Sequence, residues 1–405
     1  MNQSTARFPA ESANFDQAVD AIERWLIEQS LGDVSLTRIF SDFSRRIDQT
    51  LFPLVRSHIT MRQMHPFIDH SDHTWSRNGG LTSNSRPRSF TEDPNWAQSP
   101  LYHMLENITL KFRCDITRPE NVKKFPIFSD FRELGGTDYI AFLTPFGSQD
   151  TALRIHDGVI SSWLTDKAGG FEEREITALK HLLSLFNIIA RVFKREQTLQ
   201  DVLSAYLGPL AAHQVMKGKT QRGDGDIIQA VIWICDIRGS STLADQMKMA
   251  AYLTLLNQFF ESMSEAVMAE GGEVLKFMGD GFLAIFPTPN EAAIAGAADR
   301  ALAAARNGAK ALAALPSEAA KLKFGIGIHH GDVMFGNIGA RERLDFSVIG
   351  PAVNMTSRLQ DLTKSLDVNL LVTSEIAERS SRQLQRFPPQ LVPGLKDPIS
   401  VFTPA

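Results

Sequence analysis

The sequence predicts an α+β protein with two globular parts, and three observations support this. From residue 226 to the end, apolar strands and amphipathic helices follow one another in the order βααββαββα. Residues 1–170 begin with helices and continue with apolar strands on either side of a loop-rich middle. Residues 171–225 supply a long helix and a polar, glycine-rich segment. We therefore expect an N-terminal domain (1–170), a helical linker (171–225) and a C-terminal domain (226–405).

The N-terminal part has the element order of a small sensor domain. Its apolar patterns predict helices over 14–30 and 35–49, and strands over 51–61, 63–68, 139–144 and 153–162. Residues 69–100 contain Asn78-Gly79-Gly80 and several prolines, which indicates a loop-rich region. The whole order is similar to that of GAF and PAS sensors, so we expect a ligand or partner that the sequence does not identify. Four histidines lack the spacing of metal ligands and are better explained as scattered loop residues: His65, His70, His73 and His103.

The linker helix contains two apolar series with heptad-like spacing. The first recurs at intervals of 3, 4, 3, 4 and 3 and comprises Ile176, Leu179, Leu183, Phe186, Ala190 and Phe193. The second is offset from the first by six residues and comprises Leu199, Leu203, Tyr206 and Leu210. Two interpretations are open. The helix is a dimer seam with a phase break that transmits a register shift, or it packs on its own domain. Gly208-Pro209 then interrupts the helix.

Composition and charge exclude several classes of function. The 405 residues are 43% hydrophobic and 22% charged with a net charge of −4, which gives no broad surface for nucleic acid or an anionic membrane. The two cysteines, Cys114 and Cys235, lie far apart, which indicates a reducing, cytoplasmic compartment. The first residues are polar and lack a signal-peptide pattern. Residues 178–193 carry several polar side chains, so we expect an amphipathic helix and no membrane span.

Two segments of the C-terminal part place acidic residues at strand ends. Residues 272–286 form a β-hairpin pattern whose turn is Gly279-Asp280-Gly281, with Lys276 four residues before Asp280. The apolar strand 230–235 ends at Asp236, and a Gly/Ser-rich turn then enters a helix. Carboxylates at strand ends suit Mg²⁺, and the free N–H groups of such a turn attract phosphates. Taken alone, the hairpin also fits an ordinary Asp-Gly turn with a solvated lysine.

A third segment makes the pattern specific. Residues 344–359 carry a Val-Ile-Gly motif and then Asn354 and Arg358, which share one face of a helix because they are four residues apart. With these three segments, residues 226–365 resemble the class III nucleotidyl cyclases, and the whole chain is similar to soluble proteobacterial adenylate cyclases with a sensor-like N-terminal region. The resemblance implies a ferredoxin-like catalytic domain in which crossover helices cover one face of the sheet.

The resemblance also implies a metal and phosphate site. Asp236 and Asp280 match the two metal-binding aspartates, and the carbonyl group of Ile237 matches a further ligand. Together they would hold two Mg²⁺ or Mn²⁺ ions for in-line attack on a phosphate. The turn that would hold the phosphates comprises Gly239, Ser240 and Ser241. The family has an aromatic residue at the position of Ser240, so this departure predicts a looser turn and weaker ATP binding.

Base selection and transition-state stabilisation are assigned by the same resemblance. Lys276 and Ser347 match the positions that select the base, where guanylate cyclases usually carry glutamate and cysteine. Asn354 and Arg358 match the pair that positions the ribose and stabilises the phosphorane. Such enzymes act as head-to-tail homodimers, in which one protomer supplies the aspartates and its partner supplies these four residues.

The leading prediction is therefore an adenylate cyclase that converts ATP to cyclic AMP. The alternatives are a guanylate cyclase, which Lys276 disfavours, and a nucleotide-binding regulatory module without catalysis. Related enzymes carry a lysine near the C-terminus that contacts the triphosphate, and the nearest candidate here is Lys396, for which a solvated turn is the alternative. His329 and His330 fit a structural role at a strand end better than a role as general bases.

Overall fold

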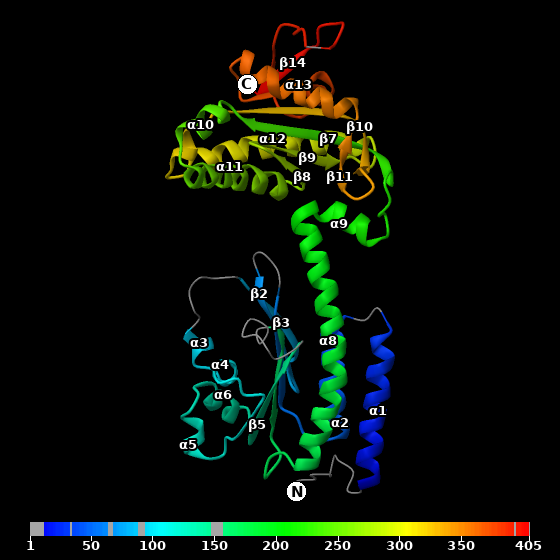
Figure 1. Ribbon diagram of the computed structural model, residues 1–405, viewed down its shortest axis with the longest axis vertical. Helices are drawn as coiled ribbons and strands as arrows, with labels where there is room; N and C mark the ends of the chain where they lie inside the picture. Colours follow the sequence, from blue (N-terminus) through cyan, green and yellow to red (C-terminus); the bar gives the residue numbers. More distant parts are fainter. Residues whose placement is uncertain are drawn as a thin grey trace. The chain divides into compact units, whose positions relative to one another are not determined.

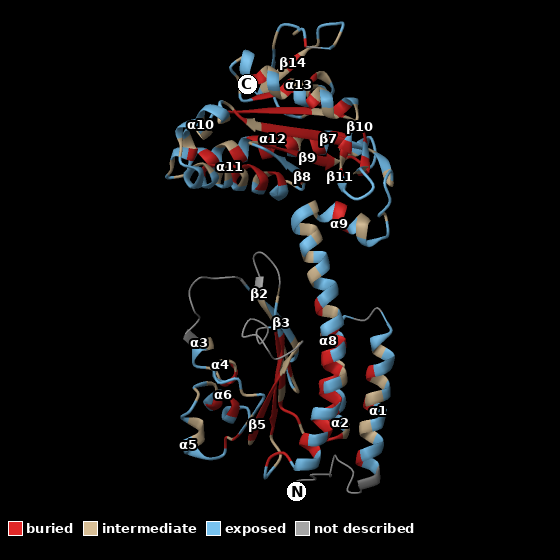
Figure 2. Ribbon diagram, viewed as in Figure 1, coloured by how far each residue is buried: buried red, intermediate tan, exposed pale blue. Residues whose placement is uncertain are grey.

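The computed structural model describes residues 12–32, 35–63, 68–87, 94–146, 157–392 and 394–404. The chain divides into two compact units, Met1–Val202 and Leu203–Ala405. Each unit has its own buried apolar core (Figure 2). The α+β class predicted from the sequence is confirmed.

The first unit is built on a six-stranded antiparallel sheet with the order β3-β2-β1-β6-β5-β4. Helices lie on both sides of this sheet (Figure 1). The strands are β1 (Arg56–Arg62), β2 (Ile68–Ser76), β3 (Gly80–Pro87), β4 (Lys111–Asp115), β5 (Asp138–Pro145) and β6 (Gly158–Thr165). Alternate strand residues face opposite sides, so the sheet buries two separate apolar clusters. One face packs on α1 (Ser12–Ser30), α2 (Leu36–Thr50) and α8 (Glu173–Leu207). The other carries α3 (Pro94–Ala97), α4 (Pro100–Glu106), α5 (Pro119–Val122) and α6 (Ile127–Glu133).

Most elements predicted for this unit are present. Both N-terminal helices, the strand within 51–61 and the strand at 139–144 are confirmed. The last predicted strand begins at Gly158, and part of the range 153–162 lies outside the described residues. The same holds for most of the predicted strand 63–68, and the following strand begins at Ile68.

The prediction of a loop-rich region over 69–100 is wrong. Strands β2 and β3 form a long hairpin there, and the sequence Asn78-Gly79-Gly80 lies at its turn. These strands consist mainly of polar residues, and β3 forms the sheet edge, so they lack the apolar alternation that identifies a half-buried strand. Of the four histidines, His70 and His73 lie in β2, His103 lies in α4, and His65 lies outside the described residues.

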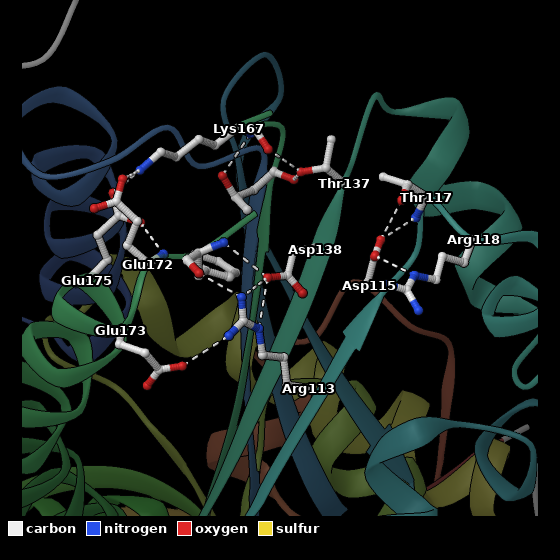
Figure 3. Close-up of polar contacts among 12 residues, drawn as sticks. Arg113, Asp115, Thr117, Arg118, Thr137, Asp138, Lys167, Glu172, Glu173 and Glu175 are labelled. Atoms are coloured by element: carbon white, nitrogen blue, oxygen red, sulfur yellow. Dashed lines mark hydrogen bonds and ion pairs between the residues drawn. The ribbon is translucent and has the colours of Figure 1, made fainter. Parts of the chain in front are cut away.

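A polar network fixes the beginning of α8 to the sheet (Figure 3). The buried carboxylate of Asp138 on β5 accepts hydrogen bonds from Arg113 Nε and from the Phe171 backbone N–H, each at 3.0 Å. The buried Glu175 accepts from the Glu172 N–H at 2.8 Å and pairs with Lys167 at 2.8 Å. Acidic side chains in the first turn also complement the positive end of the helix dipole.

Helix α8 has a buried face and an exposed apolar stripe. The first predicted series, Ile176 to Phe193, packs into the core of the first unit, so the helix packs on its own domain along this face. A different set is exposed and recurs at heptad spacing: Ile188, Val192, Leu199, Val202 and Tyr206. The offset between the two predicted series therefore marks a change from one helix face to another.

Helix α8 is also apolar over much of its length. Within the described part of the chain, it is the one helix long and apolar enough to cross a membrane by length and composition. Half of that apolar window is buried inside the structure, as in a core helix.

The second unit contains an eight-stranded mixed sheet. Its order is β13-β14-β12-β10-β7-β9-β8, and β11 pairs with β10. The strands are β7 (Gly225–Ile237), β8 (Glu273–Met278), β9 (Gly281–Pro287), β10 (Phe324–Gly339), β11 (Leu344–Ile349), β12 (Leu370–Thr373), β13 (Leu384–Arg386) and β14 (Val401–Pro404). The predicted order βααββαββα is found from β7 to α13.

Helices cover both faces of this sheet, and the two crossover helices of the ferredoxin-like core lie on the same face, as the resemblance predicted. One face packs on α11 (Met249–Ala269) and α12 (Ala292–Ala313). The other packs on α9 (Pro209–Met216) and α13 (Pro351–Ser365), as Ala211 and Ala352 join the cluster around Ile232. The smaller helices are α10 (Ser240–Gln246), α14 (Ser374–Ala377) and the 3₁₀ helix η1 (Glu318–Lys321).

Candidate active site

The two predicted metal-binding aspartates lie together at one end of the sheet. Asp236 pairs with Gly281 across β7 and β9, and Asp280 precedes Gly281 in the hairpin turn. The Ile237 backbone N–H donates to the Asp280 carbonyl at 3.3 Å. A side chain at residue 281 would place its Cβ atom 2.3 Å from the Cys235 carbonyl oxygen, so only glycine permits this close approach. The hairpin thus brings the two carboxyl groups within hydrogen-bonding reach.

The electrostatics of this pair suit a bound cation. Burial, followed by the hydrogen bond and charge of Asp280, raises the pKa of Asp236 to about 7. Asp236 Oδ1 is buried and has no hydrogen-bond partner among the described residues. A hard divalent cation between the carboxylates would satisfy this oxygen and reverse the repulsion. The two carboxylates therefore offer the hard oxygen donors that suit Mg²⁺ or Mn²⁺.

Two neighbours of this pair were not identified from the sequence. The negative charges of Asp236 and Asp280 both raise the pKa of Tyr252 on α11, although burial is the larger cause. The charge of Asp361 on α13 contributes to the raised pKa of Asp236. Both residues lie outside the two segments that carry Asp236 and Asp280, and the packing of α11 and α13 brings them near the pair.

The turn after β7, which the sequence predicts to hold phosphates, leads into a short helix. Gly239 has φ of 72° and precedes α10, whose first turn contains Ser240 and Ser241. Gly239 and Ser241 are exposed and Ser240 is half-buried, so the N–H groups at this short helix start are open to solvent.

The base-selecting residues come from two strands. Lys276 is exposed on β8 and forms an ion pair with Asp345 on β11. Ser347 is half-buried and lies two residues after Asp345, so both side chains face the same side of β11. Asp345 was not predicted as a site residue. Its alternation with Ser347 was visible in the sequence, but the pairing with Lys276 depends on the tertiary fold.

Asn354 and Arg358 lie one turn apart on α13, as predicted from their spacing. Asn354 is exposed and Arg358 is half-buried. Arg358 lies against the C-terminal loop, because a Cβ atom added at Gly394 would be 2.8 Å from its Nη2. Lys396 is exposed in the same turn. Among the described residues, no hydrogen bond or ion pair joins Asn354 or Arg358 to the aspartate pair.

The two candidate general bases are engaged in structural contacts. His329 Nδ1 lies 2.9 Å from the Thr373 hydroxyl on β12. His330 Nε2 lies 3.2 Å from the Thr288 hydroxyl. Burial lowers the pKa of both imidazoles, which favours their neutral forms.

Comparison with known proteins identifies this part of the chain. The family described as "Adenylate and Guanylate cyclase catalytic domain" matches residues 227–399. Uncharacterized protein Rv1319c of Mycobacterium tuberculosis is 34% identical over 205 residues, which cover 51% of this chain and 37% of that protein. The chain thus matches about a third of that relative's length.

Solved structures that the chain matches include an adenylyl and a guanylyl cyclase. The adenylyl cyclase CyaB from P. aeruginosa is 24% identical and covers 44% of this chain and 94% of its own, with a TM-score of 0.40. The guanylyl cyclase Cya2 is 27% identical and covers 44% of this chain and 92% of its own, with a TM-score of 0.37. The hairpin, strand-end and helix motifs all lie within residues 227–399, the part of the chain that matches the adenylate and guanylate cyclase catalytic domain.

Proposed function

We propose that this chain is an adenylate cyclase that converts ATP to 3′,5′-cyclic AMP and pyrophosphate. The observation that carries the proposal is the approach of Asp236 and Asp280 at neighbouring strand ends, with one buried carboxylate oxygen lacking a partner. Such a pair is costly to bury unless a cation neutralises it. A guanylate cyclase and a regulatory module without catalysis are the two alternatives.

The chemistry is attack of the ribose 3′-oxygen on the α-phosphorus, with release of pyrophosphate. Asp236, Asp280 and the Ile237 carbonyl would hold two divalent cations. When bound, these cations would lower the pKa of the ribose 3′-hydroxyl and neutralise charge on the triphosphate. The N–H groups at Gly239, Ser240 and Ser241 would bind phosphate oxygens. Asn354 would orient the ribose, and Arg358 would stabilise the negative charge that grows on the phosphorane.

Base selection rests on Lys276 and Ser347. Adenine presents N1 as an acceptor and N6 as a donor, so an ammonium can donate to N1 while a hydroxyl accepts from N6. Guanine reverses this edge, because O6 accepts and N1–H donates. A lysine ammonium cannot accept from N1–H, which favours ATP over GTP.

We propose that the site is completed by a second copy of the chain. In one chain, no hydrogen bond or ion pair among the described residues links the aspartate pair to Lys276, Ser347, Asn354 or Arg358. The exposed apolar stripe on α8 has the heptad spacing of a two-helix seam, which supports a homodimer.

The remaining parts of the proposal concern control and location. Residues 1–170 would act as a GAF- or PAS-like sensor, and residues 171–225 would connect it to the catalytic part. The sheet with helices on both faces and the long exit helix support this assignment. Both cysteines, Cys114 and Cys235, are buried and unpaired, which supports a reducing compartment such as the cytoplasm.

Replacing Asp280 by Asn tests the catalytic proposal against the binding-module alternative. The substitution keeps the shape of the turn but removes one metal-binding charge, so we expect turnover to fall by at least about 10²-fold. Product formation is measured beside binding of a fluorescent ATP analogue with and without Mn²⁺. Asp245→Asn, on the exposed part of α10, is the matched control. Nucleotide binding by the wild-type protein without formation of any product would support the regulatory module instead.

A further inference from the structure

The first unit contains a cavity that the proposed catalytic function does not use. It has a volume of about 440 Å³, within the range of small-molecule sites, and lies between α8 and the end of β5. Its apolar lining includes Phe142, Phe146, Leu183 and Ile188. All residues that line it belong to the first unit.

The rim of this cavity is cationic. Lys111 on β4 and Lys180 and Arg191 on α8 line it, and no acidic side chain is among its described lining residues. Within the described part of the chain, none of these three cations has an ion-pair partner. Arg191 instead lies over the Phe146 ring, 5.8 Å from the ring centre. An anion with an apolar body would therefore meet uncompensated positive charge and an apolar wall together.

A buried amide inside the cavity lacks one of its partners. Asn187 is 6% exposed and lines the cavity, and its Nδ2 donates to the Thr144 hydroxyl at 2.9 Å. Its Oδ1 is buried without a hydrogen-bond partner among the described residues. This oxygen is hidden from solvent, so the charge that an anion would meet comes from the cations of the rim.

We propose that this cavity binds a small organic carboxylate with an apolar body. The carboxylate lies beside Arg191 and Lys180, and the apolar body packs on Phe142, Phe146 and Leu183. The inference is independent of the catalytic proposal because it concerns a different unit and is tested by binding alone.

The test uses octanoate and 3-phenylpropionate as probes for the full-length chain, with titration calorimetry and thermal unfolding as readouts. 1-Octanol and 3-phenylpropanol supply the same apolar bodies without charge, and acetate supplies the charge without the body. We expect saturable one-to-one binding of at least one carboxylate probe. The matching alcohol and acetate should each bind at least about tenfold more weakly than that probe. Binding should also raise the unfolding temperature.

Three variants and one control variant locate the site. Arg191→Met and Lys180→Met should each weaken carboxylate binding about tenfold, whereas Arg195→Met, an exposed cation on the same helix outside the cavity, should leave it unchanged. Asn187→Asp places a carboxylate among the cations and should abolish binding. If Asn187→Asp does not fold, the two cation variants decide. The proposal is overturned if no carboxylate probe saturates, if alcohols bind as well as carboxylates, or if Arg195→Met weakens binding as much as Arg191→Met.

Discussion

The Asp236 carboxyl group is the group on which the proposed metal site of the second unit most depends. It lies at the end of an apolar strand, beside Asp280, with one oxygen hidden from solvent and unpartnered in the described structure. Burial and a like charge both favour its protonated form, which explains the raised pKa of about 7. A divalent cation would reverse this preference, so cation binding should release protons near neutral pH.

The ion pair between Lys276 and Asp345 leads to a prediction about base recognition. A lysine ammonium has three N–H donors, so Asp345 can hold the side chain while another N–H donates to adenine. Asp345→Asn should therefore raise KM for ATP about two- to fivefold, the effect of one exposed ion pair, and leave kcat nearly unchanged. Steady-state kinetics with ATP test this, and Glu342→Gln in the neighbouring turn is the control. A lower KM would mean that Asp345 competes with the base for Lys276.

Individual residues of the candidate site were predictable to different degrees. Asp236 and Asp280 could be placed together from sequence because each ends or turns an unmistakable apolar strand. Asp345, Tyr252 and Gly394 were missed because their proximity to the site depends on long-range packing that no local pattern encodes.

At the scale of elements, Glu273 connects the linker to the catalytic hairpin. It begins β8, the strand that carries Lys276, and it is buried. Its Oε1 accepts from the Leu210 N–H at 2.7 Å, and its carboxyl group also bonds the Ala211 N–H. These are free donors in the first turn of α9, so Glu273 caps the helix that follows α8.

Glu273 should make stability depend on pH. Burial raises its pKa to about 7 from 4.5, which outweighs the two N–H donors that lower it. The folded chain thus binds a proton that the unfolded chain has lost, and the unfolding free energy falls as pH rises from about 4.5 to 7. Glu273→Gln removes this effect. Denaturant unfolding from pH 5 to 8 should show wild type losing stability relative to Glu273→Gln.

The contribution of Asp236 to the same pH window is common to both proteins and cancels in the difference. The exposed Glu265→Gln on α11 is the control and should follow wild type at every pH. Parallel curves for wild type and Glu273→Gln would contradict the assignment.

Elements with strong apolar periodicity were predictable, and polar ones were not. The order from β7 to α13 followed from patterns of buried residues. The β2–β3 hairpin was missed because its strands are polar, although Asn78-Gly79-Gly80 is a strong hairpin signal. For α8, spacing identified a helix face but not its partner, because a domain core and a dimer seam repeat alike.

At the scale of the whole molecule, the proposed homodimer predicts complementation between two inactive chains. In a head-to-tail dimer of Asp236→Ala and Arg358→Ala chains, one site carries both defects and the other carries neither. Random mixing should therefore restore up to about a quarter of wild-type activity. Each variant is assayed alone and after co-expression, with two affinity tags to isolate mixed dimers. Isolated mixed dimers without activity would rule out a shared site.

The most direct measurement is product analysis with the purified full-length chain, Mn²⁺, and ATP or GTP in separate reactions. We expect cyclic AMP from ATP, with little or no cyclic GMP from GTP, because Lys276 donates to the adenine edge. A repeat with residues 215–405 would separate an inactive site from one inhibited by the first unit. Cyclic GMP as the main product would contradict the assignment of Lys276 and Ser347, and no product from either nucleotide with either chain would contradict the proposed catalysis itself.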